Sequence, residues 1–81
     1  MKIEIYGSGC AKCNAVENMI RHAVEEMKID AEVIKVTDLQ KMIEKGIMFT
    51  PVVFVDGVKK SEGKVPSIND VKKWLEEKNN E

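Results

Sequence analysis

The sequence predicts a single α/β domain over residues 1–81, with the element order β-α-β-α-β-β-α. Short runs of β-branched residues alternate with longer segments whose apolar residues recur every three or four positions, which indicates strands separated by helices. One hairpin signal joins the last two strands. Helical crossovers imply parallel pairing and a hairpin implies antiparallel pairing, so we expect a four-stranded mixed sheet flanked by three helices.

A β-rich run over residues 2–6 predicts the first strand, which ends at Gly7-Ser8-Gly9. The segment from residue 10 to residue 28 predicts the first helix, because its apolar residues follow helical spacing. The two cysteines, Cys10 and Cys13, therefore open this helix. The positions of its apolar stripe are Val16, Met19, Ile20, Ala23, Val24 and Met27.

The second strand is predicted over residues 31–36, and a short helix follows it. Thr37 and Gln40 have the spacing of a capping box at the start of this helix, and Gly46 marks its end. The apolar side chains of the short helix that we expect to face inward are Leu39, Met42 and Ile43.

The apolar run over residues 52–55 predicts a strand that is covered on both faces. Asp56-Gly57 is a strong two-residue hairpin signal, so an antiparallel strand is expected over residues 58–60. Ser67 caps a last helix, with Asp70 three residues further on. The expected buried stripe of that helix consists of Ile68, Val71, Trp74 and Leu75.

Composition and charge argue against several classes of function. The chain is 43% hydrophobic and 33% charged, which is typical of a globular protein and not of a disordered or membrane chain. Thirteen basic and fourteen acidic residues leave a net charge of −1, so neither nucleic acid nor a membrane surface is expected as a partner. Residues 1–5 alternate apolar and charged side chains, unlike a signal peptide, so we expect a cytoplasmic protein.

Cys10 and Cys13 are the candidate catalytic residues. Their spacing on the first turn of a helix brings two sulfurs close enough to bond reversibly. A bond that closes so small a loop adds little to stability, so a structural role is not expected. The positive end of the helix favours the thiolate of Cys10, and Lys12 would act in the same direction.

The mechanism that this pair implies is thiol–disulfide exchange. Cys10, at the junction of loop and helix, would attack a substrate disulfide and form a mixed disulfide with it. Cys13 lies inside the first turn, where its sulfur is shielded, and would then displace the remaining substrate thiol. Cys10 is therefore the expected attacking residue and Cys13 the expected resolving residue.

Metal binding is the alternative function of the same two thiolates. A zinc site would need two further ligands, and the chain has no second cysteine pair. Its only histidine, His22, falls on the polar face of the first helix, about 13 Å along the axis from Cys13. A soft ion such as Cu(I) needs only two thiolates, so Cu(I) binding or delivery stays open. Otherwise no metal and no cofactor is expected.

The sequence resembles the thioredoxin and glutaredoxin superfamily over nearly its whole length. The segment Tyr6-Gly7-Ser8-Gly9-Cys10 is similar to glutaredoxins, and residues 46–51, which end in Thr50-Pro51, have the spacing of the thioredoxin segment that ends in a cis-proline. In particular the chain resembles small single-domain redox proteins of archaea and bacteria. The resemblance implies a thioredoxin-like fold and an oxidoreductase that acts on protein disulfides, with an unidentified reductase as a second partner.

The resemblance also implies roles for individual residues. The Thr50–Pro51 bond would be cis and face the cysteines, with the Thr50 backbone pairing with an incoming peptide. Gly9, which stands where thioredoxins have a tryptophan, would lie on the substrate side. Glu4 lies six residues before Cys10, where thioredoxins keep a buried acid that handles the proton of the resolving cysteine.

Three further expectations concern partners. Glu62-Gly63-Lys64 has one glycine where the glutathione site of glutaredoxins has a Gly-Gly-Asp-like turn, so glutathione is not expected. Met48 and Phe49, just before the proline segment, could form an exposed apolar rim that holds a partner protein. The protein is expected to be a monomer.

Ferredoxin-like metal chaperones also carry a C-x-x-C pair after their first strand. Their order β-α-β-β-α-β ends on a strand, whereas this chain is predicted to end on a helix, and the difference favours redox exchange here.

Overall fold

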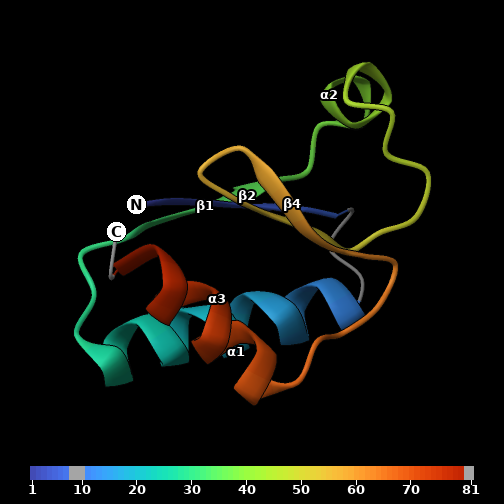
Figure 1. Cartoon of the computed structure of the whole chain (residues 1–81). Coiled ribbons are helices and arrows are strands. Elements are labelled where there is room, and N and C mark those ends of the chain that lie inside the picture. Colours follow the sequence, from blue (N-terminus) through green and yellow to red (C-terminus); the bar gives the residue numbers. More distant parts are fainter. Residues whose placement is uncertain (8–10, 80–81) are drawn as a thin grey trace.

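The computed structural model describes residues 1–7 and 11–79, and in this part of the chain four strands form one sheet between helices (Figure 1). The order β-α-β-α-β-β-α and the mixed sheet with three helices are as predicted. The elements are β1 (Lys2–Tyr6), α1 (Ala11–Met27), β2 (Glu32–Val36), α2 (Leu39–Glu44), β3 (Val52–Val55), β4 (Val58–Glu62) and α3 (Ile68–Asn79).

The strands lie in the order β2-β1-β3-β4, so β1 and β3 are central. β1 pairs with β2 in parallel, because α1 carries the chain back to the same end of the sheet. β1 pairs with β3 antiparallel, with Tyr6 opposite Val52, and β3 pairs with β4 antiparallel. Asp56 and Gly57 have φ angles of 50° and 84°, which is the backbone of the expected two-residue hairpin.

The main core lies between the sheet and the pair α1 and α3, which cover the same face (Figure 1). Both predicted helical stripes face this core, with the long side chains at their margins only partly buried. Ser67 begins α3 as predicted, because its Oγ accepts a hydrogen bond of 3.1 Å from the Asp70 N–H. The fully buried members of the core include Ile3, Ile5, Val16, Ile20, Ala23, Val53, Val55, Val71 and Leu75.

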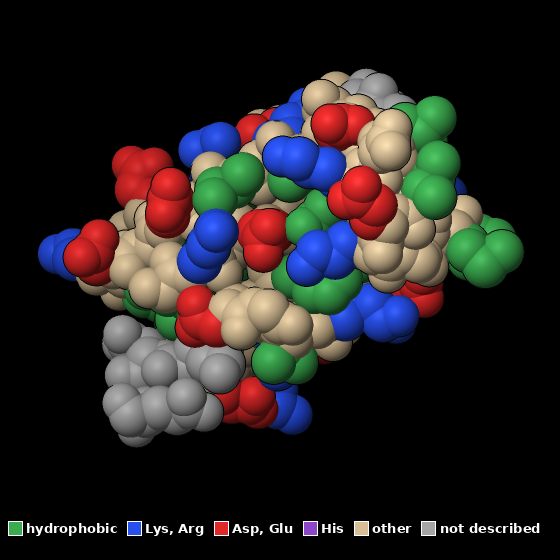
Figure 2. Space-filling view, turned by 90° about the horizontal axis from the view of Figure 1, so that it is seen from above, with side chains coloured by type: hydrophobic (Ala, Val, Ile, Leu, Met, Phe, Trp, Pro, Cys, Tyr) green, Lys and Arg blue, Asp and Glu red, His purple; other side chains and the backbone are tan. Residues whose placement is uncertain are grey.

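The opposite face of the sheet is covered by α2 only near one end (Figure 1). A small cluster of Tyr6, Met42 and Val52 forms there. Lys45, just after α2, places its Nζ 5.1 Å from the ring centroid of Phe54 and 5.9 Å from that of Tyr6. Figure 2 looks down on this face, where side chains of both charges lie among scattered hydrophobic ones.

Two expectations about α2 were wrong. Leu39 and Ile43 are 69% and 67% exposed, whereas Met42 is buried as predicted. The cause is that α2 has six residues and meets the sheet through one side chain. Its N-cap is Asp38 and not Thr37, because the Asp38 carboxylate accepts a hydrogen bond from the backbone N–H two residues on.

The helices of the described segments include none that is long and apolar enough to cross a membrane.

Candidate active site

Cys13 lies in the first turn of α1 and its side chain is fully buried. The burial follows from helical spacing, since Cys13 lies three residues before Val16 on the stripe that faces the core. Cys10 and Gly9, the predicted attacking residue and a predicted substrate contact, lie outside the described residues. The structure therefore supports the shielding expected of Cys13, and the sulfur–sulfur geometry of the pair stays a prediction.

Gly7 directly follows the last residue of β1 and packs against Cys13. A Cβ atom added at Gly7 would overlap the Cys13 Sγ and lie 2.9 Å from its Cβ. The Gly7 N–H donates a 3.0 Å hydrogen bond to the carbonyl oxygen of Val36 in β2. The sequence predicted only a turn at Gly7, because spacing along the chain does not reveal which side chain will lie against a strand end.

The segment that holds Thr50 and Pro51 reaches the same end of the sheet. Tyr6 is paired with Val52, so Gly7 directly follows and Pro51 directly precedes the last paired residues of β1 and β3. Pro51 is fully buried, and its carbonyl oxygen accepts a 2.9 Å hydrogen bond from the Gly63 N–H. The Thr50–Pro51 peptide bond is cis, the isomer that the resemblance implied.

Two exposed apolar residues precede this segment. Met48 is 82% and Phe49 is 65% exposed, in agreement with the predicted rim. Phe49 lies against the loop that follows β4, because a Cβ added at Gly63 would come within 3.0 Å of the Phe49 Cβ. The rim is thus attached to the same loop that hydrogen-bonds Pro51.

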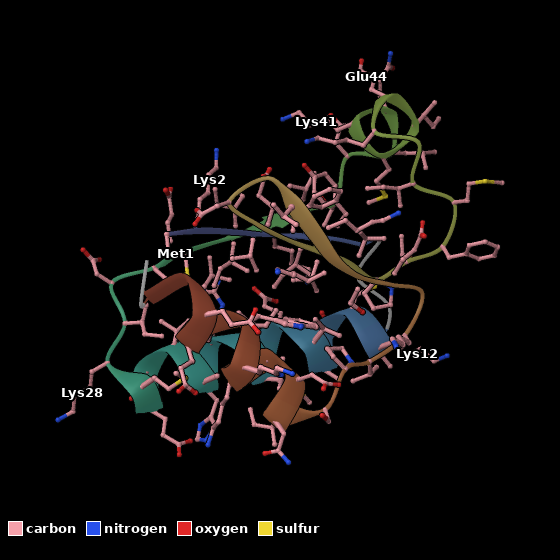
Figure 3. All side chains as sticks on the ribbon, viewed as in Figure 1. Met1, Lys2, Lys12, Lys28, Lys41 and Glu44 are labelled. Atoms are coloured by element: carbon pink, nitrogen blue, oxygen red, sulfur yellow. The ribbon has the colours of Figure 1, made fainter. Side chains whose placement is uncertain are left out.

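Lys12 lies on the exposed side of the first turn of α1, next to the buried Cys13. Figure 3 shows its side chain at the N-terminal end of the helix, directed outward from the molecule. Its charge is therefore close to the start of α1, where it adds to the positive end of the helix dipole.

Glu4 lies on the other face of the sheet from Cys13. Side chains alternate along a strand, so Ile3 and Ile5 face α1 and α3 while Glu4 and Tyr6 face the side of α2. The Glu4 carboxylate accepts a 2.9 Å hydrogen bond from the Tyr6 hydroxyl. Burial raises the pKa of Tyr6, and the Glu4 hydrogen bond and charge raise it further. This geometry directs Glu4 away from Cys13, whose proton the resemblance implied that Glu4 would handle.

The described side chains contain no group of three or more His, Cys, Asp or Glu residues placed to hold a metal ion. His22 is exposed, as predicted, and its Nε2 lies 3.1 Å from the carboxylate of Glu26 in the next turn. A two-thiolate Cu(I) site would include Cys10, which falls outside the described residues.

The order β-α-β-α-β-β-α, the buried cysteine at the start of α1 and the Thr50–Pro51 segment before β3 agree with the thioredoxin-like fold and motifs expected from the sequence. The family model described as Thioredoxin domain matches residues 1–76. The chain belongs to the thioredoxin domain family and is a thiol–disulfide oxidoreductase.

Two relatives and one solved structure illustrate the similarity. A thioredoxin of Methanocaldococcus jannaschii is 45% identical over 73 residues, which are 90% of this chain and 84% of that protein. A thioredoxin of Methanothermobacter thermautotrophicus is 44% identical over 75 residues, or 93% and 97% of the two chains. The structure of thioredoxin 1 from Thermosipho africanus aligns with a TM-score of 0.59 and 25% identity, and covers 98% of this chain and 99% of that one.

Proposed function

We propose that this protein exchanges its dithiol with disulfides of other proteins, with Cys10 as the attacking residue and Cys13 as the resolving residue of a single domain. The observation that carries the proposal is the burial of Cys13 at the start of α1, against Gly7, at the end of the sheet that the Thr50–Pro51 segment also reaches. A thiol in that position is shielded from solvent and close to the helix end at which Cys10 is placed by the sequence.

The exchange proceeds in two steps. The thiols of the protein and the substrate disulfide supply all atoms and electrons, so no cofactor is needed. The Cys10 thiolate attacks one sulfur of the substrate disulfide, so a Cys10–substrate bond forms and the other substrate sulfur leaves as a thiolate that takes up a proton. Cys13, once deprotonated, attacks the Cys10 sulfur and releases the second substrate thiol. The protein is left with a Cys10–Cys13 disulfide, and a reductase must return both electrons.

Substrate contacts are proposed for the surface around the proline segment. The exposed side chains of Met48 and Phe49 offer apolar area to a partner. We propose that the Thr50 backbone pairs with an extended substrate segment beside Pro51 and Gly9. Exposed Lys12 favours the thiolate of Cys10 by its charge. Glutathione is not proposed as a partner, and a monomeric state and a cytoplasmic location are retained as proposals.

Trapping of the mixed disulfide tests the assignment of the two cysteines. Reduced Cys13→Ser is mixed with insulin as the protein disulfide, and adducts are identified by mass spectrometry. A covalent adduct through Cys10 should accumulate, because the resolving thiol is missing. Cys10→Ser should form no adduct. The wild type should release two substrate thiols without accumulating the covalent adduct.

The exposed position Ala15, also on α1, provides the control. Ala15→Ser introduces a hydroxyl on the same helix and should behave like the wild type. An adduct through Cys13 in the Cys10→Ser protein would reverse the assigned roles. The absence of any adduct in either variant would refute the proposed exchange with protein disulfides.

A further inference from the structure

Gly7 occupies a point at which three elements meet. Its N–H donates a hydrogen bond to Val36 of β2, it directly follows Tyr6, which is paired with Val52 of β3, and the Cys13 side chain of α1 fills the space where a Cβ at Gly7 would lie. Tyr6, the last residue of β1, is paired with β2 on one edge and with β3 on the other. The strand end next to Gly7 is therefore held on both edges.

The backbone at Gly7 does not itself require glycine. Gly46, Gly57 and Gly63 have positive φ angles, which favour glycine at those three positions, whereas Gly7 lies outside that region. Space alone excludes a side chain at Gly7, because an added Cβ would overlap the Cys13 sulfur. Alanine at this position thus tests the contact with Cys13 without the penalty of a positive φ angle.

We propose that Gly7 is a positioning residue for the resolving step, and this inference rests on the proposed function. The missing side chain lets the Cys13 Sγ lie directly against the backbone at the end of β1. With alanine at position 7, the Cys13 sulfur has to move, because hydrogen bonds on either side of β1 hold the strand. Displacement of a reacting atom by about 1 Å can slow a reaction by about 10²-fold.

The two steps of the exchange depend on this contact differently. In the first step Cys10 attacks the substrate, and the Cys13 sulfur takes no part. In the second step the Cys13 thiolate forms a bond to the Cys10 sulfur, the bond between Cys10 and the substrate breaks, and the substrate sulfur leaves with the electron pair and takes up a proton. A displaced Cys13 therefore slows resolution and leaves attack unchanged.

Single-turnover kinetics of Gly7→Ala with insulin separates the two steps. Samples quenched with acid are analysed by mass spectrometry for free protein, mixed disulfide and the oxidised form. Formation of the mixed disulfide should keep the wild-type rate, whereas its decay should slow by up to about 10²-fold, so that the adduct accumulates.

Gly57→Ala is the matched control. Gly57 lies in the hairpin at the other end of β3, has a φ of 84°, and has no neighbour within 4 Å of an added Cβ. Alanine there adds backbone strain without touching Cys13, so it should lower stability and leave the resolution rate unchanged. A slowed resolution in both variants would show that loss of stability is the cause, and would overturn the inference.

Resolution at the wild-type rate in folded Gly7→Ala would also overturn it. A wild type that neither forms a mixed disulfide nor becomes oxidised by insulin would instead refute the proposed function itself. If Gly7→Ala does not fold, the double mutant Gly7→Ala/Cys13→Gly tests whether the contact with Cys13 is the cause. The second change removes both atoms that the new methyl group meets. Folding should be restored in the double mutant, and failure to restore it would contradict the contact.

Discussion

A buried resolving cysteine suits its proposed role. A thiol without solvent exposure meets few external oxidants, and an incoming disulfide cannot reach it before the exposed partner has reacted. Cys13 is buried because it lies on the core-facing stripe of α1 and because Gly7 leaves space for its sulfur. The first cause was predictable from helical spacing. The second depends on a contact between two elements, which no local pattern encodes.

Glu4 and Tyr6 form a polar pair on the far face of the sheet. Side chains alternate along β1, so Glu4 lies on the side opposite the main core, which Ile3 and Ile5 face. The comparison with thioredoxins suggested a proton-transfer role, and the strand geometry favours a hydrogen bond to Tyr6 instead. The pKa of the Tyr6 hydroxyl is raised above its ordinary value, mainly by burial and to a smaller extent by the hydrogen bond and the charge of Glu4.

Titration of Tyr6 tests this pair, and the signal is unambiguous because the chain has one tyrosine. The phenolate absorbance of the folded protein should rise at a higher pH than that of the unfolded protein, whose pKa is about 10. The protonated Tyr6 therefore adds to the free energy of unfolding. This contribution is fully present below the pKa of Tyr6 in the unfolded protein and is lost as the pH rises through its pKa in the folded protein.

Glu4→Gln is the matched variant for this titration. It removes the negative charge and keeps an acceptor oxygen, so the Tyr6 midpoint should fall but stay above that of the unfolded chain, since burial persists. Equal midpoints in the folded and unfolded wild type would contradict the account of Tyr6.

The helices differ in how far their sequences determine their environment. The apolar stripes of α1 and α3 are long and face the core as their periodicity predicted, and the two helices pack side by side on the sheet. The same reasoning failed for α2, where Leu39 and Ile43 are exposed. Periodicity identifies a potential apolar face, but it does not show whether another element will cover it. In α2 the neighbouring sheet accepts only Met42.

Alanine substitutions along α2 should reproduce this asymmetry. Met42→Ala should lower the free energy of unfolding by about 2–5 kcal/mol, because it leaves a cavity between α2 and the sheet. Leu39→Ala and Ile43→Ala remove exposed side chains and should change it by less than about 0.5 kcal/mol. Urea unfolding followed by circular dichroism measures all three, and a loss at Leu39 or Ile43 as large as that at Met42 would contradict the exposed face.

A few sequence signals were enough to predict a four-stranded mixed sheet. Its parallel pair required the helical crossover, and its antiparallel edge required the hairpin at Asp56-Gly57. The site could be predicted in part, because the cysteine pair, the proline segment and the exposed rim are each contiguous motifs. The place of Cys13 at the end of β1 depends on its contact with Gly7, and the place of the proline segment depends on strand register, both of which belong to the tertiary structure.

A redox titration of the wild type tests the central claim most directly. The protein is equilibrated in thiol–disulfide buffers between about −300 and −120 mV, its thiols are labelled, and labels are counted by mass spectrometry. The account predicts one two-electron transition in which Cys10 and Cys13 lose their labels together, and Cys13→Ser should lack it. Failure to form this intramolecular disulfide anywhere in that range, with tight Cu(I) binding in a parallel competition assay, would contradict redox exchange and favour metal carriage.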